Sequence, residues 1–475
     1  MSSTNSAAGE RAKSSSLTRL PKAGVSIFYK LGLATVAGTM LLLPLLYLAV
    51  VAAIGWGTYL FAIHCVPAIL QWNLRSSYIT LLAMFVCIVT PLATGCAVVF
   101  FMIKPVFARR RRAPVGAVHN PAFEPRIGEL IEAVCRAVGA PAPRRIEFDC
   151  GTDASAGFAG GWSGFMRNRM VLRLGLSLVA AVSQRELAGI LAHEFGHFRQ
   201  GAGMRMSFII RGVNGWFARV VYARDVWDER LETAAESEQS WVGFMGVFAS
   251  LGVMVTRGVL WLFMMGGHAI SAFLMRQMEF DADAAEIRLA GSDAFKSTTR
   301  KLSTLCAVRA ATDQQIGEIW HFHRHLPDNL PILLEHHLRS VPAEVVANIE
   351  LNLQQAKTHW SATHPSPLER MRRADTLQCS GQELADAPAR DLFNNFEDLC
   401  RGVTIGHYQN LGVPMASDRL VAVKVLVSAS NPTPGKTEEH RAIPATIPFK
   451  FEEPAASLAT ARQGETTRSG SPESR

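Results

Sequence analysis

The stretch ELAGILAHEFGHFRQGAG, residues 186–203, holds two histidines four residues apart, with a glutamate directly after the first. Its first residue completes a capping-box pattern, Ser183-Gln184-Arg185-Glu186, which predicts that a helix begins there. The helix should continue to about Gln200 and end at the glycines that follow. On such a helix, His193 and His197 lie one turn apart on the same face. The stretch therefore predicts a metal site to which one helix contributes both histidines.

Zinc is the ion that this pattern favours. A catalytic zinc site takes three protein ligands and leaves a fourth position for water. Glu194, which follows the first histidine, is placed to act as a general base on that water. The third ligand is not the distant histidine of the longer H-E-x-x-H-x-x-G-x-x-H pattern, because Gly203 stands at that position. A carboxylate from a later helix is the other common solution.

The segment RQMEFDADAAEIRLAG, residues 276–291, offers that carboxylate. It has a helical composition, and Glu279 and Asp283 are four residues apart on one face. We expect Glu279 to bind zinc, and Asp283 to accept a hydrogen bond from a ligand histidine. The alternative is a solvated acidic face of an ordinary helix.

A second group of histidines, HFHRH at 321–325 with His336 and His337, competes as a metal site. No glutamate stands in the general-base position there, and Pro327 and Pro331 interrupt the segment. We therefore predict a polar loop without a metal.

Three motifs in this order are similar to those of a known family. HEFGH at 193–197, EFDAD at 279–283 and THPSPLERMRRA at 363–374 resemble the HtpX and CAAX prenyl endopeptidase family of integral-membrane zinc metallopeptidases, with the bacterial HtpX-like members closest. The similarity covers roughly residues 120–375. It implies one zinc ion (Zn²⁺) per chain on His193, His197 and Glu279, with Glu194 as the base and Asp283 supporting a ligand.

The same resemblance places His364 and Arg370 of the third motif near the active site. They would steady the oxyanion, and Arg370 would also anchor the motif against the zinc helices. The alternative for Arg370 is an ion pair that only packs helices.

Members of the family usually carry an Asn-Ala-Phe-like edge strand along the substrate. The corresponding stretch here is Ala156-Gly157-Phe158-Ala159, which lacks the asparagine. We expect substrate to pair its backbone with this edge, although the missing amide puts the details of clamping in doubt.

Two long runs lack any charged residue, Leu31–Leu74 and Ser76–Ile103. Each exceeds the roughly 20 apolar residues that cross a bilayer, so both are predicted to be transmembrane. Lysine and arginine flank the outer ends of the runs, at Lys30 and at Arg109–Arg112, and the connection between the runs holds only Arg75. The positive-inside rule then places the N-terminus and everything after Lys104 in the cytoplasm, of a bacterial inner membrane by the resemblance. Much of the net charge of +8 is explained by this topology and by lipid headgroups, so no nucleic-acid partner is expected.

The chain between the two metal motifs must cross the membrane an even number of times, because both motifs bind one ion. Residues 203–222 are apolar apart from three arginines, and Trp241–Met275 is apolar apart from Arg257. We favour four spans, with the acidic segment between these stretches facing outward. The alternative has no crossing here, with one segment in the interface and the other folded as a hairpin.

The predicted fold is mainly α, an α+β zincin-like metallopeptidase domain with a small β-sheet joined to transmembrane helices. A helix is predicted over 125–141, and RRIEFDC and RMVLRLGLSL are predicted as strands. The domains follow as a disordered tail over 1–22, two transmembrane helices in 23–112, the peptidase domain over 113–427 with a membrane-inserted segment about 203–275, and a disordered tail over 428–475. Eight scattered cysteines without a C-x-x-C pair indicate reduced thiols.

The predicted function is a membrane-bound zinc endopeptidase in membrane-protein quality control or processing, with peptides or membrane proteins as substrates and no prediction of oligomeric state. One alternative is a catalytically silent membrane scaffold or adaptor, which should have lost a ligand or the base. Another is a transporter, which would need paired charges inside the first two spans, where none occurs.

Overall fold

The structure, a computed structural model, describes residues 17–21, 27–71, 78–103, 116–118, 120, 123–158, 164, 166–167, 169–199, 202–222, 240–360, 362–413 and 419–430. The chain divides into two compact units. The globular unit comprises residues 1–26, 113–205 and 274–449, and the helical unit comprises 27–112, 206–273 and 450–475.

A small sheet lies in the globular unit, as the sequence predicts. Its four strands run in the order β1-β2-β4-β3. β2 pairs parallel with β4, and β3 pairs antiparallel with β4, so β3 forms one edge. The strands are β1 (Ala117–Val118), β2 (Arg145–Asp149), β3 (Ala154–Phe158) and β4 (Met170–Gly175).

The strand predicted over RMVLRLGLSL ends earlier than expected, because α7 (Leu176–Ala181) begins directly after Gly175. A Cβ at residue 175 would lie 2.2 Å from the carbonyl oxygen of Gly151, so only glycine fits where the chain leaves the sheet. The hydroxyl of Ser177 then donates to the carbonyl of Cys150, 3.0 Å away, which fixes the turn into the helix.

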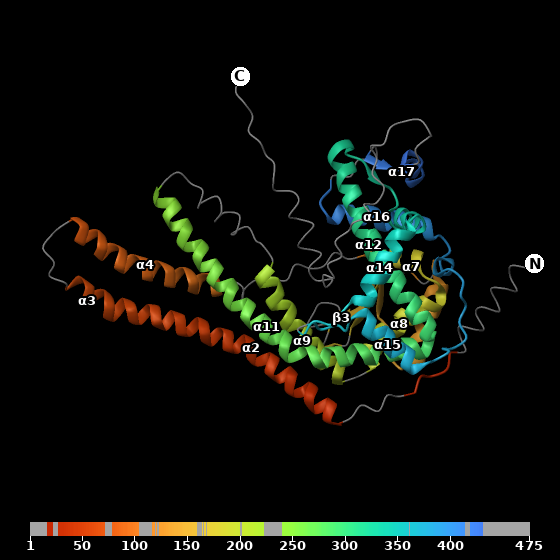
Figure 1. The fold of residues 1–475 in the computed structure, drawn as a ribbon, viewed down its shortest axis with the longest axis horizontal. Helices are drawn as coiled ribbons and strands as arrows, with labels where there is room; N and C mark the ends of the chain where they lie inside the picture. Colours follow the sequence, from red (N-terminus) through yellow and green to blue (C-terminus); the bar gives the residue numbers. More distant parts are fainter. Residues whose placement is uncertain are drawn as a thin grey trace, which may run out of the picture. The chain divides into compact units, whose positions relative to one another are not determined.

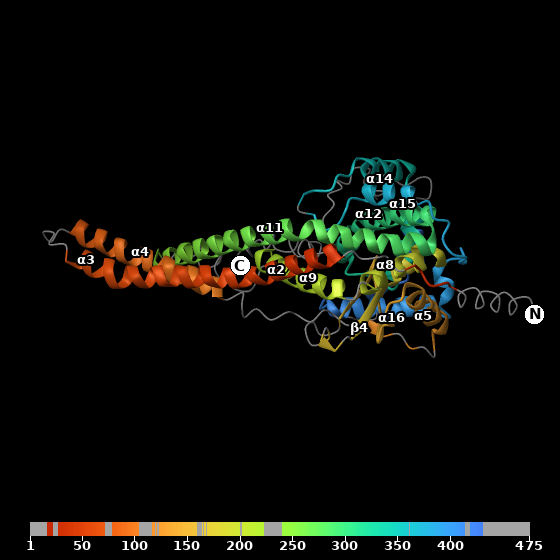
Figure 2. The ribbon, with the colours of Figure 1, turned by 90° about the horizontal axis from the view of Figure 1, so that it is seen from below.

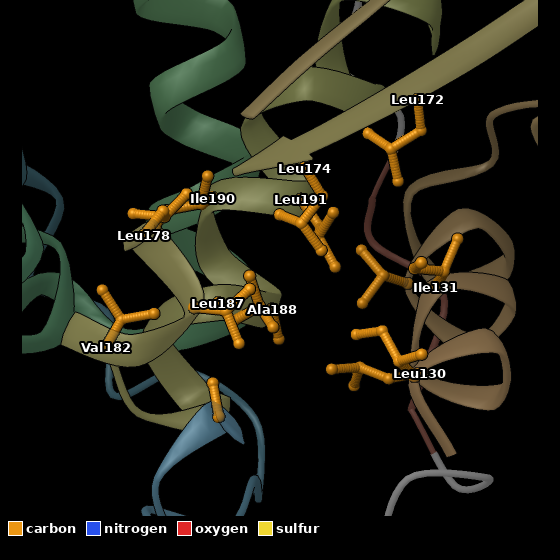
Figure 3. Close-up of a cluster of buried hydrophobic side chains, with 14 of the residues drawn as sticks. Leu130, Ile131, Leu172, Leu174, Leu178, Val182, Leu187, Ala188, Ile190 and Leu191 are labelled. Carbon is orange, nitrogen blue, oxygen red and sulfur yellow. The ribbon is translucent and has the colours of Figure 1, made fainter. Parts of the chain in front are cut away.

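Helices α5 (Pro125–Val138) and α8 (Gln184–Arg199) enclose the core below this sheet. α5 ends at Gly139, whose φ of +81° is left-handed. α8 begins at the predicted capping box, where the Ser183 amide donates to Glu186 Oε2 over 2.9 Å and the Glu186 amide donates to Ser183 Oγ over 3.3 Å. Leu130 and Ile131 of α5 point toward α8, and burial of each such side chain contributes about 1.5–3 kcal/mol (Figure 3).

The later part of the globular unit is helical (Figures 1 and 2). The long α11 (Ser240–Ala290) enters it from residue 274. A short parallel pair, β5 (Leu326–Pro327) with β6 (Leu420–Val421), lies among the helices. The other elements are α12 (Ser292–His323), α13 (Leu330–Arg339), α14 (Ala343–Gln355), α15 (Pro367–Leu377), η3 (Ala389–Leu392), α16 (Phe396–Asn410) and α17 (Val423–Ser430).

The loop predicted for the histidine group is wrong in part. His321 and His323 lie in the last turn of α12, which continues until Arg324 takes a left-handed φ of 57°. Pro327 does not shorten α12, because a proline restricts chiefly the backbone of the residue before it, which here is Leu326, beyond the end of the helix. His325 lies outside the helix, so it does not share a helical face with His321. His336 and His337 lie in α13, where His337 Nδ1 is 2.8 Å from Thr312 Oγ1.

Residues 17–21 fall within the tail predicted to be disordered, but they pack on the globular unit. Leu20 is buried in the main core, and its amide donates to the carbonyl of Ala137 over 2.8 Å. The Gln382 side chain accepts from the Thr18 amide and donates to the Thr18 carbonyl. Leu17 also packs against this core, partly buried. The composition of the whole tail gave no sign of these contacts. Residues 1–16, 22 and 431–475 of the predicted tails lie outside the described residues. Residues 428–430, predicted to belong to the disordered C-terminal tail, instead form the end of α17.

The helical unit contains α2 (Ile27–Leu60), η1 (Phe61–Cys65), α3 (Val66–Leu70), α4 (Tyr78–Ile103), α9 (Ala202–Tyr222) and residues 240–273 of α11. α2 and α4 lie side by side (Figures 1 and 2). All four long helices contribute to its core, with Tyr47, Met102, Phe217 and Leu260 among the buried residues. The Tyr47 hydroxyl donates to the carbonyl of Met102 over 2.7 Å.

Three helices of the described chain are long and apolar enough to cross a membrane, over Leu31–Leu70, Leu81–Ile103 and Gly252–Ala290. α9 is not among them, and it carries exposed arginines at 211 and 219. The predicted count of four spans therefore stays a prediction. The acidic segment at 223–239 and Arg109–Arg112 lie outside the described residues.

Candidate metal centre

The centre is built where α8 approaches the C-terminal part of α11. Gly189 and Gly196 of α8 are seven residues apart, so they share one helical face. A Cβ on Gly189 would lie 2.9 Å from the Cβ of Ala290, and one on Gly196 would lie 3.1 Å from the Cα of Ala282. The two glycines therefore allow a contact between helices that a side chain would prevent.

The three predicted ligands converge at this contact. His193 Nε2 lies 3.5 Å from Glu279 Oε2, and His197 Nε2 lies 3.7 Å from Glu279 Oε1. One ligand atom from each residue can be chosen so that all three lie within 4.8 Å of one another. Zinc bonds of about 2.0–2.1 Å at tetrahedral angles put ligand atoms roughly 3.4 Å apart. Two imidazoles and one carboxylate at these separations fit zinc, and they leave its fourth position to water or substrate.

Asp283 lies behind His193, on the side of its ring away from Glu279. Its carboxylate is fully buried, and Oδ1 lies 3.0 Å from His193 Nδ1, the ring nitrogen that faces away from Glu279. Burial lowers the pKa of His193, but the carboxylates of Asp283 and Glu279 outweigh burial and hold that pKa well above its usual value. The carboxylates therefore favour positive charge at the site, whether it comes from a proton or from a metal ion.

Arg370 pairs with Asp283 in a two-pronged contact, Nε to Oδ2 at 2.9 Å and Nη2 to Oδ1 at 2.5 Å. Burial lowers the pKa of Arg370, but the charge of Asp283 outweighs burial and raises it, so the guanidinium stays charged. This contact joins α15 to α11 and supports the anchoring role predicted for Arg370. The predicted oxyanion role stays a prediction.

Sequence reasoning missed Glu286, which is buried, with Oε2 3.7 Å from His193 Nδ1. Its spacing of three from Asp283 and seven from Glu279 places all three on one face of α11, and this signal could have found it. His193, Asp283 and Glu286 form a second group close enough to hold an ion. Asp283 is already engaged by Arg370, so the group with His197 and Glu279 is the better zinc site.

Glu194 lies between the two candidate ligand histidines in sequence and reaches the edge strand. The amide of Ala156 in β3 donates to Glu194 Oε2 over 3.1 Å. The ring of Phe158 packs edge-on against Phe198 of α8, with centroids 5.7 Å apart, and so joins the same strand to the same helix. Of the edge stretch predicted at 156–159, Ala156, Gly157 and Phe158 lie in β3, and Ala159 lies outside the described residues.

His364 lies at the rim of the centre, with Nδ1 3.3 Å from Glu279 Oε2 and half of its side chain exposed. Arg276, one turn before Glu279, holds the preceding loop by donating to the carbonyls of Trp360 and Ala362 over 3.2 and 3.0 Å. Ser366 then caps α15 by accepting from the amide of Glu369. The role of Arg276 has no signal in the sequence, because its partners are carbonyl groups more than 80 residues away.

Comparisons with known proteins agree with this geometry. The chain is 30% identical over 151 residues to Protease HtpX of Acinetobacter baylyi, 31% of this chain and 46% of the relative. It is 27% identical over 143 residues to a Protease HtpX homolog of Methylacidiphilum infernorum, 30% of this chain and 45% of the relative. With Protease HtpX of Chromohalobacter salexigens it shares 26% identity over 219 residues, 46% of this chain and 68% of the relative.

The chain thus spans about half the length of the first two of these relatives. No solved structure matches it significantly. The model of Peptidase family M48 matches residues 121–378, which is more than half of the chain and includes both metal motifs and the third motif. The predicted resemblance is confirmed, and the chain belongs to peptidase family M48.

Proposed function

We propose that this protein is a membrane-bound, zinc-dependent endopeptidase. The observation that carries the proposal is the convergence of His193, His197 and Glu279 beside Glu194, whose carboxylate reaches the edge strand β3. Zinc, when bound by these three residues, would polarise the scissile carbonyl and make water a stronger nucleophile.

Side chains of the protein itself would transfer the proton, stabilise the developing charge and orient the ligand His193. The carboxylate of Glu194 takes a proton from the attacking water and passes it to the leaving amine. His364, at the rim, is proposed to stabilise negative charge on the carbonyl oxygen. Asp283 and Arg370 hold His193 in the orientation that binding requires.

The proposed substrates are peptide segments of membrane proteins, in quality control or processing. An extended segment would add to the edge of the sheet at β3. The apolar helices would hold the centre beside a bilayer, and the flanking charges favour a cytoplasmic centre at a bacterial plasma membrane. The relatives named Protease HtpX support a proteolytic activity of this kind.

The test compares bound zinc and casein cleavage, in detergent, for the wild type and Glu194→Gln. Glu344→Gln is the matched control, because Glu344 is exposed on α14. All three proteins should hold about one zinc per chain. Glu194→Gln should lose roughly 10²- to 10⁴-fold in rate, while the control cleaves normally.

Other outcomes have distinct meanings. Zinc in every protein without cleavage in any would favour a silent scaffold that keeps the fold. A wild type that binds no zinc would overturn the proposal.

A further inference from the structure

Strand β3 presents a free edge, with which no other described strand pairs, and its backbone groups alternate in direction. In an antiparallel pair, neighbouring residues point their amides alternately toward the partner strand and away from it. Ala156 stands opposite Leu172 of β4, and its amide donates to Glu194 instead of to β4. The outward amides of β3 are therefore those of Ala154, Ala156 and Phe158.

The same free edge is where an added substrate strand would form its hydrogen bonds. A substrate carbonyl that pairs with β3 at this position needs the amide of Ala156. That amide has one hydrogen, which already serves the carboxylate of Glu194 at 3.1 Å. Substrate and Glu194 thus compete for one donor.

We propose that the Ala156 amide is a positioning group that holds Glu194 in a resting orientation until a substrate strand takes its place. Pairing of the substrate with β3 then releases Oε2 of Glu194 for proton transfer. Docking along the edge and availability of the base become coupled, so peptides too short to pair with β3 are cleaved poorly. This inference rests on the proposed peptidase function.

The coupling makes a prediction that a purely structural role does not. Ala156→Pro removes the amide hydrogen, and proline is tolerated on an edge strand where the amide faces away from its partner. With a long unfolded substrate, kcat/KM should fall roughly tenfold, because one strand-pairing bond is lost. With an acylated dipeptide amide, kcat/KM should rise roughly tenfold, because the bond from the Ala156 amide no longer restrains Oε2 of Glu194.

Ala154→Pro is the matched control, since Ala154 also points its amide outward but lies two residues from the one that bonds Glu194. It should weaken cleavage of the long substrate without improving cleavage of the short one. The inference would be overturned if Ala156→Pro lowered kcat/KM equally for the long and the short substrate. It would also be overturned if the ratio of the two kcat/KM values were the same in Ala156→Pro and in Ala154→Pro.

A second measurement does not depend on activity or on tolerance of proline. Residue-resolved hydrogen–deuterium exchange compares the zinc-loaded wild type with Glu194→Ala. The Ala156 amide should exchange roughly tenfold faster in the variant, while Ser155 and Gly157, which point toward β4, stay unchanged. If the wild type binds zinc and cleaves, but the Ala156 amide exchanges at the same rate in the wild type and in Glu194→Ala, the coupling alone is refuted. Absence of zinc from the wild type would refute the proposed function itself.

Discussion

Asp283 is the residue that we expect to control the orientation of the proposed metal centre most directly. It is fully buried between the ring of His193 and the guanidinium of Arg370, so it links a proposed metal ligand to α15. A carboxylate behind a ligand histidine fixes the ring tautomer and raises the basicity of the ligand.

Asp283→Asn should therefore lower zinc affinity about 10- to 100-fold. Competition with a chromophoric chelator measures this affinity. Asp281→Asn is the matched control, because Asp281 lies on the same helix but bonds Gln277 instead of a ligand. Equal affinity in the two variants would show that Asp283 does not act on the metal.

The substitution also leaves Arg370 without its carboxylate, which costs up to about 3–5 kcal/mol of folding stability. The double variant Asp283→Asn with Arg370→Met removes the unpaired charge and should recover part of that loss. Its zinc affinity should stay low, because the contact with His193 is still altered. Recovery of both properties together would mean that the effect on zinc came from unfolding.

Two histidines outside the centre should make the stability of the globular unit depend on pH. Burial lowers the pKa of His337, and the charge of His336 lowers it further. Burial likewise lowers the pKa of His407, with a contribution from Arg309. Histidines of the unfolded chain have an ordinary pKa of about 6.5, so below that pH the unfolded chain binds more protons than the folded unit does. Stability should be fully present above about pH 6.5 and fall as the pH drops below it.

Thermal unfolding at about pH 7.5 and about pH 5.5 tests this dependence. His407→Gln should show a smaller loss between the two conditions than the wild type. His323→Gln, at an exposed position on α12, serves as the control and should match the wild type. A drop in His407→Gln as large as that of the wild type would contradict the assignment.

At the scale of elements, the distance between α8 and α11 decides whether the ligand set can form. Gly196→Ala places a methyl group 3.1 Å from the backbone of Ala282, and backbone cannot move aside as a side-chain end can. Overpacking of this kind costs about 1–3 kcal/mol and should separate Glu279 from the two histidines. We expect lower zinc retention after dialysis, measured by metal analysis.

Gly402→Ala is the matched control, because it makes the same glycine-to-alanine change inside a helix without a close neighbour. Nothing lies within 4 Å of a Cβ at residue 402, so alanine should stabilise α16 by up to about 1 kcal/mol. Full zinc retention in Gly196→Ala would show that the helices tolerate the extra methyl group.

Local signals predicted much of the fold because their causes are local. The capping box before α8 and the glycine after α5 lie next to the elements they limit, so both ends could be predicted from the sequence. The contact of Gly196 with Ala282 and the bond from Ala156 to Glu194 join distant parts of the chain. The periodicity of apolar residues along one segment does not predict which distant segment it contacts. The ligand spacing on each helix was predictable, but the approach of the helices was not.

At the scale of the whole molecule, the topology has to bring both metal motifs to one face of the membrane. His197 and Glu279 would share one ion, yet the chain between them contains α9 and an apolar part of α11. If α11 crosses, a second crossing is required, and α9 is the described segment that could supply it. An arginine at the centre of a bilayer costs about 2.5–3.5 kcal/mol or more, so Arg211 and Arg219 oppose that assignment. The two arrangements differ in where residues 223–239 lie.

Labelling of cysteines with a membrane-impermeant maleimide in intact cells decides between them. Cys65, Cys87 and Cys96 are exposed in the helical unit and are first replaced by alanine, while Cys306, exposed on α12, is retained. Gln71→Cys, at the exposed end of α3, should react in intact cells, because the connection after the first span is predicted to face outward. Cys306 should react only after permeabilisation, and labelling of it in intact cells would contradict a cytoplasmic centre. Ser237→Cys should react in intact cells if the chain has four spans, and only after permeabilisation if α9 stays in the interface and α11 does not cross.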